Sequence, residues 1–322
     1  MPNYDVVCLG MAVCDILAGP VDASIFDRDT TKVPSIEMRS GGDAMTQAVI
    51  SSRLGCKTAL ASKVGNDAYG RFLLDTLTAE GIGHSHVRIG EDGIDTAVSI
   101  VLVGNDGQRS FIASKGLNNI TLCLEDLDMD LICGANFLSY GSLCFMKSLD
   151  PVVGEAVFRE ARRHGVKVVA DCCANVYHYP PEVILNTLSQ IDYFVPSEEE
   201  AFGLTQQAEP RKMAQALFDY GCKNLIIKLG TKGCYVKSPE LEGLMPAFSV
   251  DKVVDTTGAG DNFVGGLLSA LNRGLNLVKA VQFAQAAAAV SIQEVGATKA
   301  VRSRGQVDEF LKTQMTEGVF KR

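Results

Sequence analysis

The chain has 322 residues, of which 47% are hydrophobic and 21% are charged, and its formal net charge is −8. This length and apolar content suffice for the core of an enzyme-sized globular protein. Because the charge is negative and lysine and arginine form no block, the composition argues against a nucleic-acid partner and favours a small molecule. No apolar run reaches the roughly 18 residues that span a bilayer, so we expect no membrane partner.

The ten cysteines show no CxxC pair, no zinc spacing and no dense disulfide framework. They are typical of buried thiols in a reducing compartment, which predicts a cytoplasmic protein. The amino terminus is apolar, but it lacks a basic leading region and carries Asp5 and Asp15. It therefore suits a buried strand better than a signal peptide.

Strands and helices alternate in the first part of the chain. The apolar run at 6–10 ends in glycine, as is typical of a strand buried on both faces of a parallel sheet. The glycine turn Ser40-Gly41-Gly42-Asp43 then leads into a helix over 44–54. A strand at 58–64 and a helix between Gly70 and Gly81 follow. The alternation predicts an α/β protein.

A β hairpin interrupts this alternation. Residues 96–103 and 109–113 are rich in β-forming types, and Asn105-Asp106-Gly107 between them is a turn cluster. We expect the hairpin to lie outside the parallel sheet. Arg109 on the hairpin could reach a substrate, but an exposed arginine is the simpler interpretation and is favoured.

The alternation resumes after the hairpin and continues to the end of the chain. The expected strands are 137–140, 166–171, 193–196, 224–229 and 234–237, and the expected helices are 151–164, one from 181, 198–204, 211–220, 261–272, 278–290 and 306–314. Without a linker, repeat or low-complexity tract, this order predicts a single doubly wound domain over 1–322 with a small β excursion. Asp171 and Asn175 follow a strand at the edge where such folds bind ligands, so either could touch a substrate or only satisfy loop amides.

The stretch from Val250 to Gly266 carries the clearest chemistry. A β segment leads through a turn of small residues into a helix with an apolar face. Gly258, Ala259 and Gly260 leave N–H groups at the helix N-terminus open to an anion, and the helix dipole adds to the attraction. Asp261 lies beside that anion site, where its carboxylate can accept a hydroxyl proton. The stretch therefore predicts phosphoryl transfer to an alcohol, with Asp261 as the base and Gly258 to Gly260 as the anion hole.

Two other interpretations of this stretch remain open. Asp261 could simply cap its helix at the end of a glycine-rich loop. A dinucleotide fingerprint would share the first two glycines, but Phe263 replaces the third and no acidic residue follows about 20 positions later. A phosphate-binding loop of the lysine-containing type is absent, because Gly65 to Gly70 is followed by Arg71.

The run Asp255-Thr256-Thr257-Gly258-Ala259-Gly260-Asp261 resembles the carboxyl-terminal signature of the ribokinase-like (PfkB) carbohydrate kinases. Residues 41–48 with Arg53-Leu54-Gly55 look similar to the amino-terminal signature, so the resemblance covers nearly the whole chain. Among bacterial members, the chain looks closest to the YdjH-type sugar kinases. The resemblance implies a ribokinase-like doubly wound fold, a mostly parallel sheet flanked by helices, and a β lid of about 12–38 and 94–114. It also implies a sugar substrate, ATP with Mg²⁺, and a homodimer formed through the lid.

The resemblance assigns roles to further residues. It implies substrate contacts at Asp15, Gly41, Gly42, Thr46 and Asp261. It implies nucleotide contacts at Ser197, Glu200, Lys228, Gly230, Thr231, Gly233 and Gln285. Glu200 would organise Mg²⁺ through water, and the oxygens around Asp255 and Thr257 resemble a site for a monovalent cation such as K⁺.

Four positions depart from the family pattern. Ser197 and Thr46 each replace an asparagine that is usual in the family. These changes leave open how the magnesium waters and the substrate are held. Val13 stands where ribose-binding members carry an asparagine, and Ser142 lies in a region where some ribose-specific members have a carboxylate. Because a site built for a hydroxyl group loses much affinity when a partner is missing, these changes disfavour ribose itself.

The leading hypothesis is an ATP-dependent kinase that phosphorylates a hydroxyl of a monosaccharide or sugar derivative. A nucleoside kinase of the same family shares all these motifs, although the scarcity of tryptophan and phenylalanine at 11–45 argues mildly against it. A non-catalytic sugar or nucleotide sensor is the third hypothesis, and such a binder would have no need of a base at position 261. The sequence leaves the sugar and the phosphorylated hydroxyl open.

Overall fold

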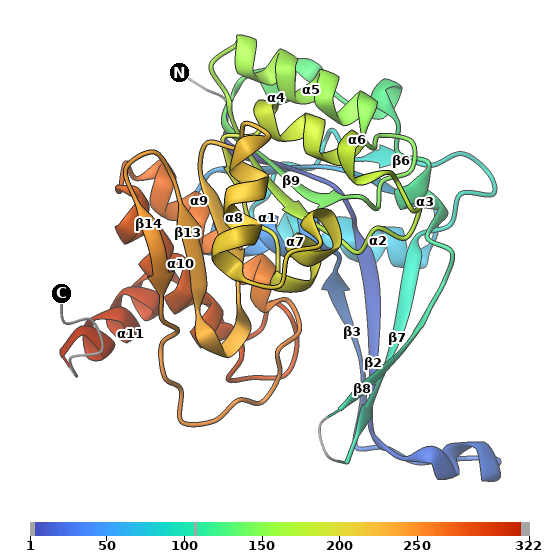
Figure 1. The fold of residues 1–322 in the computed structure, drawn as a ribbon. Coiled ribbons are helices and arrows are strands. Elements are labelled where there is room, and N and C mark those ends of the chain that lie inside the picture. Colours follow the sequence, from blue (N-terminus) through green and yellow to red (C-terminus); the bar gives the residue numbers. More distant parts are fainter. Residues whose placement is uncertain (1–3, 106–107, 317–322) are drawn as a thin grey trace.

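An eight-stranded sheet forms the centre of the computed structural model, which describes residues 4–105 and 108–316 (Figure 1). Its strand order is β14-β13-β12-β11-β10-β9-β1-β4. The strands are β1 (Tyr4–Leu9), β4 (Thr58–Ala61), β9 (Ala135–Leu143), β10 (Lys167–Cys172), β11 (Tyr193–Phe194), β12 (Leu225–Lys228), β13 (Cys234–Lys237) and β14 (Glu242–Met245). All neighbours from β4 to β12 pair in parallel, and β13 and β14 add antiparallel pairs at one edge. The predicted mostly parallel sheet is confirmed.

Helices cover both faces of this sheet. Successive residues of a strand point to opposite faces, so each apolar strand contributes to two cores. In β1, Val6 and Cys8 belong to one core and Val7 and Leu9 to the other. The first core packs against α1 (Asp43–Arg53), α2 (Ala68–Ala79), α9 (Ala259–Asn272), α10 (Leu277–Ser291) and α11 (Arg304–Thr316). The second packs against α4 (Met129–Cys133), α5 (Val152–Arg163), α6 (Pro181–Leu185), α7 (Glu198–Thr205) and α8 (Pro210–Asp219). Each helix predicted from the pattern begins within about two residues of its expected start.

A second sheet projects from the body of the molecule (Figure 1). Its order is β3 (Ser35–Gly41), β2 (Val13–Val21), β7 (Ala97–Gly104) and β8 (Arg109–Ala113). β7 and β8 pair antiparallel, which confirms the predicted hairpin and its place outside the parallel sheet. Asp106 and Gly107 of the predicted turn lie outside the described residues. The predicted lid segments contain β2, β7, β8 and the first part of β3, and we call this sheet the lid sheet.

The predicted β segment just before Gly258 is wrong. Residues 246–256 form no strand. The N–H groups of Val254 and Asp255 instead donate to the carbonyl of Ile292, at 2.8 and 3.2 Å, so this segment pairs with the end of α10 and not with a strand. Among the described residues, no helix combines the length and the apolar character that crossing a membrane requires.

Candidate active site

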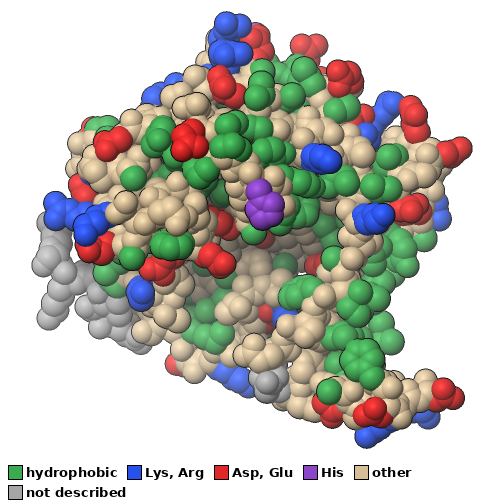
Figure 2. Space-filling view, turned by 45° about the vertical axis from the view of Figure 1, so that its right-hand side comes forward, with side chains coloured by type: hydrophobic (Ala, Val, Ile, Leu, Met, Phe, Trp, Pro, Cys, Tyr) green, Lys and Arg blue, Asp and Glu red, His purple; other side chains and the backbone are tan. Residues whose placement is uncertain are grey.

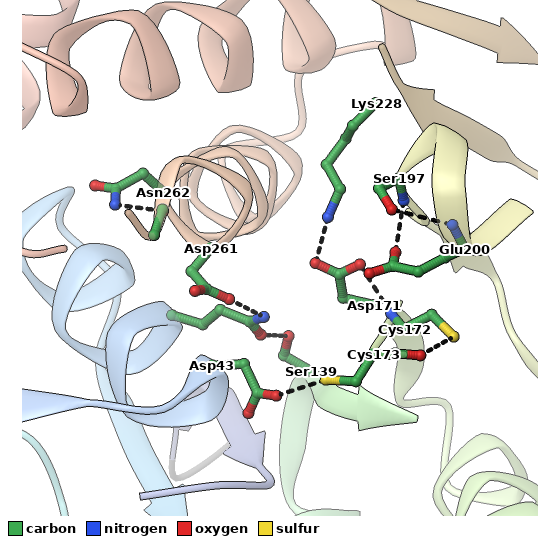
Figure 3. Close-up of polar contacts among 12 residues, drawn as sticks. Asp43, Ser139, Asp171, Cys172, Cys173, Ser197, Glu200, Lys228, Asp261 and Asn262 are labelled. Carbon is green, nitrogen blue, oxygen red and sulfur yellow. Dashed lines mark hydrogen bonds and ion pairs between the residues drawn. The ribbon is translucent and has the colours of Figure 1, made fainter. Parts of the chain in front are cut away.

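Four charged side chains meet at the carboxyl edge of the parallel strands, where open α/β sheets bind their ligands. Asp171 lies near the end of β10, Lys228 ends β12, Asp43 begins α1 and Asp261 lies in the first turn of α9. Figure 3 shows these side chains converging on one space. Figure 2 shows the surface hollowed between the body and the lid sheet. The fold thus brings together residues that are far apart in the sequence.

Asp261 is held by a buried glutamine that the sequence analysis did not single out. Gln47 Nε2 donates to Asp261 Oδ1 at 3.1 Å, and Gln47 Oε1 accepts from the Ser139 hydroxyl at 2.7 Å. Gln47 is fully buried, so its amide has a fixed orientation. The N-cap of α9 is Gly258, so the interpretation of Asp261 as a simple helix cap is wrong.

The environment of Asp261 suits a general base. Burial raises the pKa of its carboxyl group to about 8, the carboxylates of Asp43 and Asp171 act in the same direction, and the ammonium of Lys228 opposes them. A base is most effective when its pKa lies near the working pH, because it is then both available and strong enough to take the proton. An ordinary exposed aspartate has a pKa of about 4, so its carboxylate would be too weak a base by several pKa units.

The turn before α9 keeps the small residues that an anion site needs. Gly258 has a φ of 70°, and a Cβ there would lie 2.6 Å from the Cβ of Ala297, so glycine is required. Asn262 Nδ2 holds the turn by donating to the carbonyls of Gly258 and Ala297, both at 2.7 Å. A Cβ added at Gly260 would lie 3.2 Å from Lys228 Nζ, which places an ammonium group beside the helix N-terminus. Both features attract a phosphate.

Lys228 balances two carboxylates, the buried Asp171 and the half-buried Glu200. Its Nζ lies 2.5 Å from Asp171 Oδ2. Burial alone would lower the pKa of Lys228, but Asp171 and Glu200 outweigh burial and raise it, so the amine stays charged. Burial raises the pKa of Glu200, and the neighbouring Asp171 adds to that effect. Asp171, for which the sequence left two roles open, is therefore the partner of the predicted nucleotide residue Lys228.

Ser197 and Glu200, two predicted nucleotide residues, form a capping box at the start of α7. The Ser197 N–H donates to Glu200 Oε2 at 2.7 Å, and the Glu200 N–H donates to Ser197 Oγ at 3.2 Å. Among residues 4–105 and 108–316, no group of three or more His, Cys, Asp or Glu side chains could hold a metal ion. Mg²⁺ commonly uses one or two carboxylates together with substrate phosphates and water, so Asp171 and Glu200 fit that smaller requirement.

The other predicted nucleotide residues lie apart from these contacts. Gly230 and Thr231 form an exposed 3₁₀ turn, η4 (Gly230–Lys232), directly after β12, and Gly233 closes it. Gln285 is buried in α10, and its Nε2 donates to the carbonyls of Met245 and Pro246 at 3.0 and 3.1 Å. Its amide nitrogen is therefore engaged in holding the chain after β14. Nucleotide contact at these positions stays a prediction.

The predicted substrate residues Asp15, Gly41 and Gly42 lie together. In the strand register, Asp15 of β2 lies opposite Arg39 of β3. A Cβ at Gly41 would lie 2.1 Å from Asp15 Oδ2, so glycine leaves room for the carboxylate. Gly42 has a φ of 86° where the chain enters α1. Burial raises the pKa of Asp15 to about 6, against the opposing charge of Arg109. Thr46 is buried one turn into α1, and its contact with a substrate stays a prediction.

Asp43 is a second residue whose position the sequence did not reveal. Its Oδ1 accepts from the Met11 N–H at 3.2 Å and from the Ser142 hydroxyl at 2.5 Å, and its Oδ2 accepts from the Cys173 thiol at 3.4 Å. Asp43 and Gln47 are one helical turn apart, and this spacing directly after the diglycine is the signal that could have identified both.

Arg109 is not the exposed arginine that the sequence favoured. Its side chain is only 11% exposed and forms an ion pair with the Asp255 carboxylate. The same guanidinium donates to the Thr257 hydroxyl. The carbonyl and side-chain oxygens around these two residues are the ones expected to bind a monovalent cation. Strand β8 of the lid sheet therefore contacts the segment that precedes Gly258 to Gly260, which we call the anion turn.

Comparison with known proteins identifies the family of the chain. The model of the pfkB carbohydrate kinase family matches residues 3–304. The chain is 31% identical to a probable fructokinase-7 of Arabidopsis thaliana, over 96% of this chain and 92% of that protein. It is 29% identical to the ribokinase of Haemophilus influenzae, over 88% of this chain and 91% of that protein.

Solved structures with a similar fold include sugar kinases. The structure of Arabidopsis thaliana ribokinase, complexed with ribose and ATP, superposes with a TM-score of 0.79 at 24% identity, covering 96% of this chain and 99% of that one. The fold is therefore ribokinase-like, as expected. The expected closeness to YdjH-type kinases stays a prediction. The chain belongs to the PfkB family of carbohydrate kinases, which are phosphotransferases that act on sugars.

Proposed function

We propose that this protein transfers the γ-phosphoryl group of ATP to a hydroxyl group of a monosaccharide or sugar derivative. One observation carries the proposal: the Asp261 carboxylate, with a pKa of about 8, is fixed by Gln47 beside a helix N-terminus that also has an ammonium group next to it. A base beside an anion site is what phosphoryl transfer to an alcohol requires.

Each residue of the site has its own role in the reaction. Asp15, beside Gly41, holds a hydroxyl of the sugar, and the reacting hydroxyl gives its proton to Asp261. The Ala259 N–H donates to the Thr256 carbonyl at 3.2 Å. The N–H groups of Gly258 and Gly260, with the ammonium of Lys228, therefore stabilise most of the negative charge of the transferring phosphoryl group. Asp171 and Glu200 are the side chains that would hold Mg²⁺, through water in the case of Glu200. When bound, Mg²⁺ neutralises charge on the ATP phosphates.

The substrate class follows from relatives and from the departures around the sugar site. Relatives bear the names fructokinase and ribokinase. Residues 141–144 contain no carboxylate, and the Ser142 hydroxyl among them is already bonded to Asp43. Position 13 carries a valine. The carboxylate of some ribose-specific members and the asparagine of ribose-binding members are thus both missing. We therefore propose a ketose, or another pentose or hexose derivative, in preference to ribose.

The test is ADP release with ATP and Mg²⁺ against a panel of ketoses, aldoses, sugar acids, sugar phosphates and nucleosides. A sugar that is turned over well supports the proposal. Turnover of nucleosides alone would replace it with the nucleoside kinase hypothesis. Specific sugar or nucleotide binding without any turnover would support the non-catalytic sensor.

Asp15→Ala is expected to raise the KM for the sugar about 10- to 100-fold with a smaller effect on kcat, because one hydrogen bond from a hydroxyl to a carboxylate is lost. Steady-state kinetics on the best sugar of the panel measure this. Asp29→Ala, which removes an exposed aspartate of the lid segment, is the matched control and should leave KM unchanged. An unchanged KM in Asp15→Ala would remove this residue from the sugar site.

We further propose that the chain is a single domain whose lid sheet covers the sugar and also forms a homodimer. Cross-strand partners point to the same face, so Met38, Ile16, Ile100 and Ile112 form one row across the sheet, on the face opposite to Asp15. Three of them are well exposed: Met38 is 42%, Ile100 37% and Ile112 56% exposed. Figure 2 shows hydrophobic side chains gathered along this sheet. Such a row supports packing against a second copy.

Ile100→Asp is expected to convert the dimer into a monomer, since a charge in the centre of an apolar interface cannot be paired. Light scattering coupled to size-exclusion chromatography measures the mass. Val152→Asp places the same charge on a residue of α5 that is 70% exposed, and it should leave the dimer intact. A monomeric wild-type protein at micromolar concentration would contradict this proposal.

The cysteines support a cytoplasmic location. All ten are free thiols in the structure, and most of them are buried within the two cores. A reducing compartment keeps such thiols unpaired, so we propose that the protein works in the cytosol. A kinase that uses ATP finds its co-substrate there.

A further inference from the structure

The segment that precedes the anion turn contains a buried carboxylate with a complete set of partners. The side chain of Asp255 is 1% exposed. Its Oδ1 accepts the N–H of Thr257 at 2.8 Å, and its Oδ2 accepts the N–H of Gly296. A carboxylate this deeply buried also needs a positive charge nearby. The guanidinium of Arg109 supplies that charge.

The family resemblance places a K⁺ ion at this position, and the residues present do not fit one. K⁺ would need the side-chain oxygens of Asp255 and Thr257 among its ligands, together with nearby carbonyl oxygens, but Arg109 contacts both side chains. A guanidinium and a K⁺ carry the same single charge, so the two would compete for one position. The guanidinium has the additional advantage of fixed donor geometry, because its N–H groups lie in a rigid plane.

Arg109 reaches this position from another part of the fold. It opens strand β8 of the lid sheet, whereas Thr257 is 148 residues away in the chain, immediately before the anion turn. The guanidinium therefore joins the lid sheet to the segment that orients the N–H groups of Gly258 to Gly260. A free ion could not make that connection.

We propose that Arg109 takes the place of the monovalent cation, as a built-in positive charge carried by the lid sheet, so that this protein neither needs nor binds K⁺ at Asp255 and Thr257. Arg109 is then a positioning residue that keeps the anion turn in its catalytic form when the lid sheet is in place. The inference rests on the proposed kinase function for its kinetic consequence only. The binding consequence is independent of the substrate.

Thermal unfolding in KCl and in tetramethylammonium chloride, each at about 100 mM so that screening is equal, is the first test. The wild-type protein should unfold at the same temperature in both salts. Arg109→Ala should unfold at a lower temperature and should gain on the order of 3 °C in KCl, because the emptied position then binds K⁺. Guanidinium ions at about 20 mM should stabilise the variant in the same way, although this concentration is too low to denature.

Kinetics on the best sugar of the panel form the second test. Arg109→Ala should lose about 10-fold in kcat in tetramethylammonium chloride and regain most of it with K⁺ or guanidinium, whereas the wild-type rate should not respond to K⁺. Arg28→Ala removes an exposed arginine near the tip of the lid sheet and serves as the matched control. Should the alanine variant fail to fold, Arg109→Gln, which keeps the length without the charge, is measured identically.

Stabilisation or activation of the wild-type protein by K⁺ over tetramethylammonium would overturn the inference. So would an Arg109 variant that responds to neither ion, because the guanidinium would then serve another purpose, such as binding phosphate. If no sugar is phosphorylated, the proposed function fails, but the unfolding comparison still decides this inference because it uses neither ATP nor sugar.

Discussion

Asp261→Asn is expected to lower turnover about 100-fold or more while leaving the affinity for ATP nearly unchanged. The amide has the shape of the carboxylate and can still accept the hydrogen bond from Gln47, so the geometry of the site should survive. What is lost is the ability to take the hydroxyl proton. ADP release measures turnover, and isothermal calorimetry measures nucleotide affinity. Unchanged turnover would exclude Asp261 as the base.

The pH dependence follows from the pKa of about 8 for Asp261. Because the base must be ionised, kcat/KM of the wild-type protein should rise from pH 6 to about pH 8 and then level off, and this limb should be absent from the residual activity of Asp261→Asn. Asp75→Asn, which neutralises an exposed aspartate on α2, should reproduce the wild-type profile.

As pH rises from about 4 to about 8, the stability that Asp261 contributes to the folded protein should fall while the activity rises. The folded pKa of Asp261 lies above the unfolded value of about 4, so the folded protein binds the proton more tightly. Its contribution to stability is complete below pH 4 and is lost as pH rises toward 8. Asparagine does not ionise, so Asp261→Asn should unfold several degrees above the wild-type protein near pH 8 and close to it near pH 4. A purely structural aspartate would not combine higher stability with lost turnover.

Much of the fold could be predicted from the sequence because its signals are local. Helices such as α5 and α10 show apolar spacing over three turns or more, and buried strands such as β1 are short apolar runs that end in glycine. Dependence on local signals also explains the wrong prediction for the segment before Gly258. Its residue types suit a strand, but its backbone N–H groups pair with the end of α10, which no local pattern announces.

The chemistry of the site was predictable only where it lies within one short segment. Gly258 to Asp261 unites an anion turn and a base in four consecutive residues. The contacts that tune this segment come from distant parts of the chain: Gln47 is 214 residues from Asp261, and Arg109 is 148 residues from Thr257. Spacing along the sequence carries no information about such pairs, so Arg109 was expected in solvent although it is buried against a carboxylate.

Lys228→Gln is expected to have the largest effect on stability. It leaves the buried Asp171 and the half-buried Glu200 carboxylates without their cation. Breaking the Lys228–Asp171 pair in this way costs about 3 to 5 kcal/mol, on the order of 10 °C in unfolding temperature. ATP affinity should fall about 10-fold or more, because the ammonium beside Gly260 is also lost. Lys223→Gln is the matched control. It breaks a Lys223–Asp192 pair whose lysine side chain is 50% exposed, and such a pair contributes about 0 to 1 kcal/mol.

A double variant separates the two roles of Lys228. Lys228→Gln combined with Asp171→Asn replaces the ion pair by two neutral amides that can bond each other, so most of the lost unfolding temperature should return. ATP affinity should not return, because no positive charge is restored beside the anion turn. Asp171→Asn alone is the control, because Asp171 would also hold Mg²⁺, and ATP affinity is measured without Mg²⁺. If the double variant binds ATP as well as Asp171→Asn does, Lys228 acts on the nucleotide only through Asp171. If it regains stability but binds ATP more weakly than Asp171→Asn does, the ammonium itself contacts the phosphates, and one lysine both neutralises the carboxylates of the site and binds the nucleotide.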